Sequence, residues 1–127
     1  MGTKQGLILF AHGARDPQWS LPFQEVAARV RRAMPAVEVE LAFLEFMTPD
    51  LAQAAEQLLA RGATKVEVLP LFLGAGGHVR RDLPAIVETL KRNYPDVIWH
   101  LHHAAGESPV VIDALARAAL DALQGVE

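Results

Sequence analysis

The chain contains no cysteine among its 127 residues, which excludes both a disulfide framework and thiol chemistry. Its apolar runs are too short to cross a bilayer, and residues 1–4 lack the apolar core of a signal peptide. The net charge is −3, and lysine and arginine are not concentrated in any segment, which argues against nucleic-acid binding. We therefore expect a cytoplasmic protein with neither a membrane nor a nucleic acid as partner.

Apolar residues make up 51% of the chain, and they fall into strand-like and helix-like patterns that alternate. Four strands are predicted at 6–11, 37–43, 65–72 and 97–102, each followed by a helix. The first and third strands are the more continuously apolar, so we expect them at the centre of the sheet. The predicted fold is α/β, a doubly wound four-stranded parallel sheet in the order 2-1-3-4 with helices on both faces.

Proline and short polar residues mark the expected helix starts. Thr48 is predicted as an N-cap with Pro49 at the first helical position, and Ser108 precedes Pro109 in the same way. Pro84 is expected in the first turn of the third helix, which makes Asp82 its candidate N-cap. No linker or low-complexity segment divides the chain, so residues 1–127 are expected to form one domain.

Two histidines, His12 and His78, lie beside glycine where the first and third strands are expected to end. Parallel strands present their carboxyl ends at one edge, where such sheets bind ligands. A single histidine after a strand is more often structural, but two that converge favour a function. Imidazole binds transition metals and is a base near neutral pH. Because no cysteine completes a structural zinc site, a metal here is expected to be held loosely.

A carboxylate and a glycine segment complete the expected site. Glu45 follows the second strand within an apolar run, where a carboxylate is costly unless it is paired or solvated, although it could also be an exposed loop acid. Residues 74–77 could cradle a phosphate at a helix N-terminus, but they match neither a Walker loop nor the dinucleotide fingerprint. We interpret them as a loop that lets a flat ligand approach the backbone, with a plain flexible turn as the alternative.

Charged and imidazole side chains near this edge have two interpretations each. Arg15, Arg80 and Arg81 could pair with ligand carboxylates or could be solvated surface groups. His100, His102 and His103 cluster on and after the fourth strand, where they could deliver metal or simply face solvent.

The chain resembles the small CbiX-type sirohydrochlorin chelatases over nearly its whole length. The resemblance rests on the opening strand with residues 12–17, on the element 43–45, and most specifically on the glycine–histidine stretch 70–82. Members of this family more often carry serine after the His-Gly pair, where this chain has Ala14.

The resemblance implies a single CbiX-type chelatase domain that inserts a divalent metal, most often Co²⁺, into sirohydrochlorin on the route to cobalamin. Related members insert Ni²⁺ or Fe²⁺. By this resemblance His12 and His78 bind the metal, His12 also accepts pyrrole protons, and Glu45 is the acid at the macrocycle. The residues implied to line the tetrapyrrole are Leu73, Gly74, Ala75, Gly76, Gly77 and His78, with Arg15 at its rim.

The resemblance further implies that the metal and the tetrapyrrole are substrates and that no cofactor is permanently bound. Long members of the family contain two fused halves, and a chain of this length matches one half, so a homodimer is implied.

The residue pattern alone also suggests two functions other than metal insertion. Phosphoryl transfer through a phosphorylated His12 beside Arg15 is disfavoured, because the usual signature has arginine before the histidine and this chain has Ala11. A carrier or sensor that binds metal or tetrapyrrole without metalating it stays open.

Overall fold

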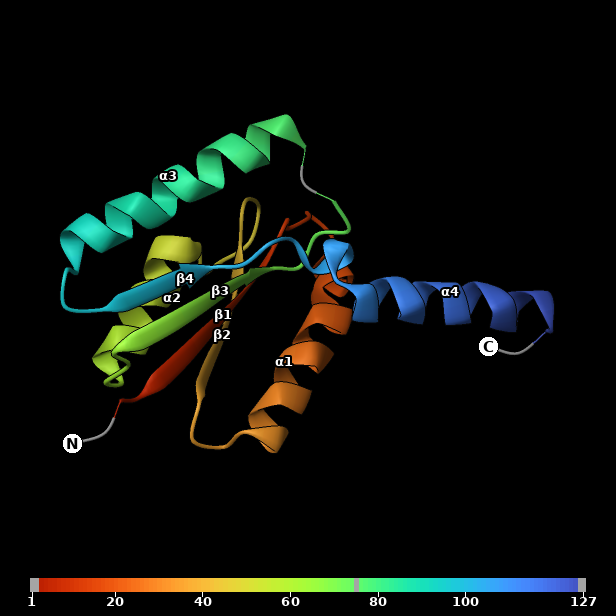
Figure 1. The fold of residues 1–127 in the computed structure, drawn as a ribbon, viewed down its shortest axis with the longest axis horizontal. Helices are drawn as coiled ribbons and strands as arrows, with labels where there is room; N and C mark the ends of the chain where they lie inside the picture. Colours follow the sequence, from red (N-terminus) through yellow and green to blue (C-terminus); the bar gives the residue numbers. More distant parts are fainter. Residues whose placement is uncertain (1–2, 75, 126–127) are drawn as a thin grey trace.

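The central element is a parallel sheet of four strands in the order β2-β1-β3-β4, which confirms the predicted order (Figure 1). The computed structural model describes residues 3–74 and 76–125; the side chain of His78 lies outside this description, as does the whole of Ala75. The strands are β1 (Gln5–Ala11), β2 (Glu38–Phe43), β3 (Lys65–Pro70) and β4 (Ile98–Leu101). β3 ends at Pro70, which has no N–H to donate, although the N–H of Leu71 still donates to Phe10 O of β1.

One half of one sheet face is covered by α1 (Leu21–Ala33), which follows the short 3-10 helix η1 (Pro17–Ser20). α1 packs Ala27 and its neighbours over the half of the sheet that β1 and β2 form. The buried residues of this cluster are Leu9, Ala11, Ala27, Val39, Leu41 and Phe43.

The opposite face carries the larger core, under α2 (Leu51–Ala60) and α3 (Gly77–Asn93). Both helices follow the 3.6-residue spacing that the sequence predicts, with Leu58 of α2 and Val87 of α3 buried. Trp99 of β4 lies on the same face and is buried as well. This core fixes the positions of the loops that leave the carboxyl ends of the strands.

Two predicted helix starts are wrong. α2 is capped by Asp50 and not by Thr48, because the Asp50 carboxylate accepts from the N–H of Gln53 at 2.8 Å while the Gln53 side chain accepts from the N–H of Asp50 at 2.9 Å. α3 begins at Gly77, several residues before the predicted cap Asp82, so Pro84 lies inside the helix. The N–H of Arg80 already donates to Gly76 O, which closes the first turn upstream of the proline.

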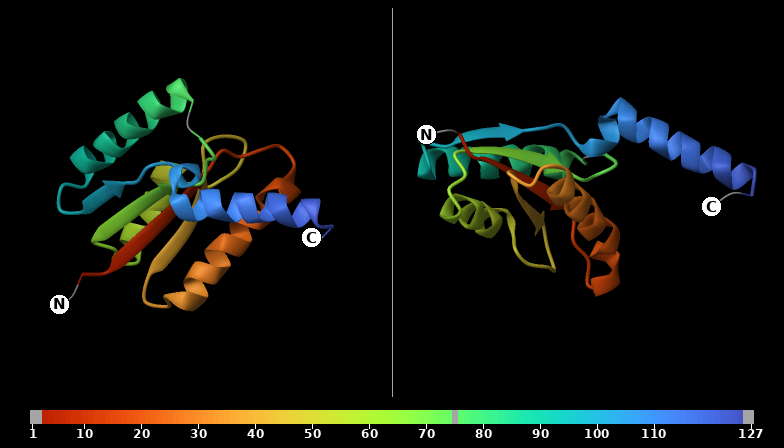
Figure 2. Two further views of the ribbon diagram at one scale, coloured as in Figure 1. Left: turned by 45° about the vertical axis from the view of Figure 1, so that its right-hand side comes forward. Right: turned by 90° about the horizontal axis from the view of Figure 1, so that it is seen from below.

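The last helix, α4 (Pro109–Leu123), starts as predicted, with the Ser108 hydroxyl accepting from the N–H of Val110. It follows the short 3-10 helix η2 (Ala105–Glu107) and points away from the sheet (Figure 1; Figure 2, right). None of its residues, all of which the structure describes, is buried. Helices therefore lie on both faces as expected, but α4 covers neither. The described helices lack the length and apolar character that a bilayer crossing requires.

Candidate functional site

The ladder between β1 and β2 continues beyond the last paired residues of the two strands. Leu44 donates its N–H to Ala11 O at 2.9 Å, and Glu45 donates its N–H to His12 O at 3.1 Å. The backbone thus holds Glu45 beside His12 at the carboxyl edge of the sheet, as the parallel arrangement predicts.

Gly13 is required by this close approach. Its φ is +95°, and a Cβ built on it would lie 1.9 Å from the carbonyl oxygen of Glu45. A side chain at this position would therefore push the segment after β2 away from β1. The glycine in the His-Gly pair has a structural reason that the sequence alone did not reveal.

The side chains of His12 and Glu45 contact each other at this edge. His12 Nε2 lies 3.1 Å from Glu45 Oε1, and the two side chains are 52% and 48% exposed. The edge of the Phe72 ring meets the imidazole, with the ring centroids 6.2 Å apart. A half-exposed imidazole paired with a carboxylate can bind a metal ion or exchange a proton with an incoming ligand. The predicted proximity of these two residues is confirmed, whereas their roles stay a prediction.

A hollow of about 430 Å³ opens beside this pair, between the sheet and α3. Its lining residues are Phe10, His12, Leu44, Glu45, Val79, Asp82, Leu83 and Ile86. Sequence reasoning missed Val79 and Asp82 as lining residues, since it placed Asp82 at a helix cap. The spacing of the four α3 members, at 79, 82, 83 and 86, is the signal that could have found them.

The glycine segment lies at the start of α3. Leu73 is 69% exposed, and a Cβ added to Gly74, Gly76 or Gly77 would meet no atom within 4 Å. The predicted loop is shorter than expected, because Gly77 and His78 belong to the first turn of α3. Ala75 lies outside the described residues, and the structure does not describe where the His78 imidazole points.

The three arginines are dispersed. The guanidinium of Arg15 stacks over the Phe46 ring, with its Cζ 4.9 Å from the ring centroid. Arg80 borders a second hollow of about 370 Å³ that Phe72 also lines, and Arg81 lies in the second turn of α3. Carboxylate binding by these arginines stays a prediction.

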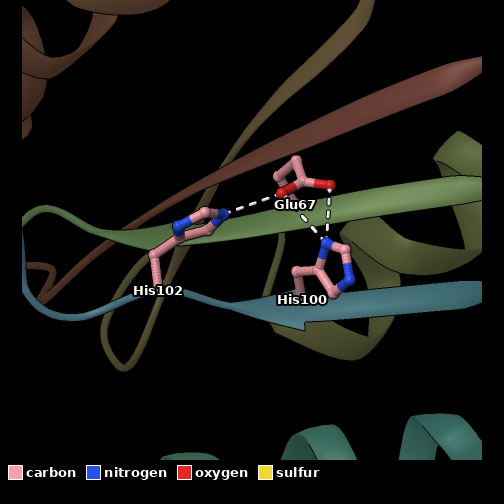
Figure 3. Close-up of polar contacts among 3 residues, drawn as sticks. All are labelled: Glu67, His100 and His102. Atoms are coloured by element: carbon pink, nitrogen blue, oxygen red, sulfur yellow. Dashed lines mark hydrogen bonds and ion pairs between the residues drawn. The ribbon is translucent and has the colours of Figure 1, made fainter.

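A separate polar cluster lies on the sheet face that α1 leaves open (Figure 3). Glu67 of β3 contacts His102 Nε2 at 2.8 Å and His100 Nδ1 at 3.2 Å. Burial raises the pKa of Glu67, but the hydrogen bonds from His102 and His100 outweigh burial, so the net pKa is lowered. His103 also follows β4, and it lines the hollow that Arg80 borders.

No group of three histidine or acidic side chains, within the part of the chain that the structure describes, is arranged to hold a metal ion. This holds for Glu67, His100 and His102, whose nitrogens point at carboxylate oxygens. It also holds for His12 and Glu45, which form a pair and not a set of three. The imidazole of their expected partner, His78, lies outside the described side chains.

The model of the CbiX family matches residues 6–122. The chain belongs to the CbiX family. A curated relative from Saccharolobus islandicus, named "Sirohydrochlorin cobaltochelatase", is 36% identical over 85 residues. A solved CbiX structure from Marinobacter aquaeolei VT8, named for cobalamin (vitamin B12) biosynthesis, has a TM-score of 0.82 at 28% identity and covers 94% of this chain and 98% of that one.

A second solved structure is the sirohydrochlorin chelatase SirB from Bacillus subtilis subspecies spizizenii, in complex with cobalt. It has a TM-score of 0.73 at 26% identity, and the match covers 94% of this chain and 51% of SirB. The match to the S. islandicus relative spans 65% of this chain and 62% of that protein. Together these comparisons confirm the resemblance to CbiX chelatases and the predicted fold.

Proposed function

We propose that this CbiX chain is a chelatase that inserts a divalent metal, with Co²⁺ preferred, into sirohydrochlorin during cobalamin biosynthesis. The observation that carries the proposal is the contact between His12 and Glu45 at the carboxyl edge of the sheet, in a chain that matches the CbiX family over residues 6–122. The relatives named for this reaction and the cobalt complex of SirB support the choice of substrate and metal.

Metal insertion exchanges one divalent cation for two pyrrole N–H protons, so the site needs a metal ligand and a base. In the proposed mechanism His12 and His78 bind the incoming metal as neutral imidazoles. The lone pair on His12 Nε2 can hold the metal or accept a proton, but not both at once. Transfer of the metal to the macrocycle therefore frees this nitrogen to take one pyrrole proton and pass it to Glu45, 3.1 Å away. The imidazole of His12 then takes the second pyrrole proton, so both protons leave the macrocycle.

The macrocycle is proposed to lie over the glycine segment and the hollow beside His12. A methyl group added to Gly74, Gly76 or Gly77 would have no protein atom within 4 Å, so nothing in the free protein demands glycine there. A flat ligand that lies close to the backbone would explain why these positions lack side chains. Leu73, Ala75 and Arg15 complete the proposed tetrapyrrole contacts.

We further propose that residues 1–127 act as one domain and as a homodimer in the cytoplasm. The dimer is supported by the match to SirB, in which this chain corresponds to 51% of the SirB chain. The compartment rests on the composition of the sequence alone. No permanently bound cofactor is proposed, because the metal is a substrate.

The test is the absorbance spectrum of sirohydrochlorin mixed anaerobically with the protein and with Co²⁺, Ni²⁺ or Fe²⁺ in turn. We expect catalysed metalation above the protein-free rate, fastest with Co²⁺. His12→Ala should slow it roughly 100-fold or more, and Glu45→Gln should slow it less.

Glu56→Gln is the matched control, because Glu56 is exposed and lies outside the proposed machinery. Wild-type rates in His12→Ala would overturn the role of His12. A spectral shift that is stoichiometric, with no turnover for any metal, would favour the carrier or sensor. Faster turnover with Ni²⁺ or Fe²⁺ would keep the chelatase and change its metal.

A further inference from the structure

The turn that follows β2 carries an exposed aromatic ring on an unfavourable backbone. Phe46 has a φ of +65°, and within residues 3–74 and 76–125 it is the only residue other than glycine with a positive φ. Bulky side chains rarely adopt this region, because their Cβ comes too close to the backbone. The phenyl ring is also 57% exposed, so burial offsets little of this strain.

Hydrogen bonding and packing fix the position of Phe46 at the tip of this turn. Met47 donates its N–H to Glu45 O at 2.8 Å, which closes a three-residue γ-turn centred on Phe46. The form of this turn with a positive φ is the rare and strained one. Leu44 packs against the larger core and Met47 against the core under α1. The chain therefore anchors both sides of the turn and presents the ring between them to solvent.

The ring lies at the same edge of the sheet as the candidate site. Phe46 directly follows Glu45, and in Figure 1 the turn after β2 and the segment after β1 lie at the same end of the sheet. The guanidinium of Arg15 stacks over the ring, 4.9 Å from its centroid. Because β1 lies between β2 and β3, Phe46 and the exposed Leu73 flank His12 from the two neighbouring strands.

We propose that the phenyl ring of Phe46 contacts the tetrapyrrole and holds Arg15 ready to bind a carboxylate at its rim. A tetrapyrrole is flat and apolar at its centre and carries carboxylates at its edge, so an aromatic ring with a guanidinium on it matches both parts. A contact made only with the ligand also explains why the free protein keeps an exposed ring on a strained backbone. This inference rests on the proposed function and adds Phe46 to its substrate contacts.

Phe46→Gly is the informative substitution, because glycine adopts a positive φ readily and the turn is therefore retained. Metal-free sirohydrochlorin is titrated anaerobically with protein, and its fluorescence anisotropy gives the Kd. We expect Phe46→Gly to bind roughly 10-fold more weakly than the wild type, and Phe46→Tyr to stay within about 2-fold of it. Met34→Ala is the matched control and should bind as the wild type does, because Met34 is 53% exposed but precedes β2 at the opposite edge of the sheet.

Steady-state metalation separates substrate contact from a structural role in the turn. If the ring contacts the tetrapyrrole, Phe46→Gly should raise KM by roughly 10-fold and leave kcat within about 2-fold, since His12 and Glu45 are unchanged. If Phe46 serves only to place Glu45, kcat should fall while the Kd stays the same. Circular dichroism checks that each variant is folded.

A double variant tests whether the ring acts only through Arg15. Phe46→Gly should weaken binding further when it is added to Arg15→Ala. Equal Kd values for Arg15→Ala and for the double variant would mean that the ring only holds the guanidinium.

The strain itself is tested by comparing Phe46→Gly with Phe46→Ala, which both remove the ring. Phe46→Gly should unfold at the higher urea concentration, the reverse of the usual order, because only alanine keeps an unfavourable φ. Both variants should bind sirohydrochlorin equally weakly, so that the loss of binding follows the ring and not the stability.

The results distinguish failure of this inference from failure of the proposed function. Wild-type affinity in Phe46→Gly, a fall in kcat alone, or equal Kd values in the Arg15→Ala background would overturn the inference and leave the proposed chelatase intact. A wild-type protein that neither binds nor metalates sirohydrochlorin would overturn the proposed function, and the inference with it.

Discussion

Gly13 offers the sharpest test of how the site is built, through the substitution Gly13→Ala. The added methyl would lie 1.9 Å from the carbonyl oxygen of Glu45, whereas ordinary contacts begin at 3.4 Å. Alanine at a φ of +95° costs about 1–3 kcal/mol. Relief of the overlap costs a further 1–3 kcal/mol or so, because the backbone bond from Glu45 to His12 must lengthen or break.

We therefore expect Gly13→Ala to lower the free energy of unfolding by about 2–6 kcal/mol, out of the 5–15 kcal/mol or so that is typical of a domain. Urea titration followed by circular dichroism should show the midpoint fall by roughly 1–3 M for an m value near 2 kcal/mol/M. Metalation should fall further than stability explains, because Glu45 moves away from His12.

Gly77→Ala is the matched control, since a methyl at Gly77 meets no atom within 4 Å. If Gly13→Ala unfolds within about 0.5 kcal/mol of this control, the segment after β2 is not held against β1 in the way the structure describes.

Three further outcomes are expected. Gly77→Ala should leave the urea midpoint unchanged or slightly raised while increasing the KM for sirohydrochlorin, and an unchanged KM would remove the glycine segment from the proposed contacts. Asp50→Ala should lower the free energy of unfolding by about 1 kcal/mol through loss of the capping box, and Asp50→Asn should restore most of it. The pKa of Glu67 is lowered in the folded protein, so its carboxylate stabilises the fold at pH values above its ordinary pKa of 4.5. This contribution is lost as the pH falls through the lower pKa of the folded state. Glu67→Gln should therefore lose less stability than the wild type below about pH 4.5, and equal acid sensitivity of the two proteins would contradict the pairing.

The strands and their order could be predicted because the signal is local. Continuous apolar runs mark the central strands β1 and β3, and alternation marks the outer strands β2 and β4. The helix starts are harder to predict, because a proline near a helix start does not show by itself which turn it occupies. Pro84 shows the exception: its missing N–H costs a hydrogen bond inside α3, yet the helix extends back to Gly77.

The candidate site was partly predictable for a different reason. His12 and Glu45 follow neighbouring parallel strands, so topology alone brings them to one edge. The contact between Gly13 and Glu45 joins residues far apart in the sequence, and no local pattern carries it. The same is true of α4, whose periodicity predicts an amphipathic helix but does not predict that it points away from the sheet.

The continuation of the β1–β2 ladder has a consequence for how this family can diversify. The positions of His12 and Glu45 are set by main-chain hydrogen bonds, from Leu44 to Ala11 and from Glu45 to His12, and not by packing of the two side chains. Both side chains are half exposed, so replacing either one disturbs little of the core. A scaffold of this kind can exchange its polar groups one at a time while the protein continues to fold.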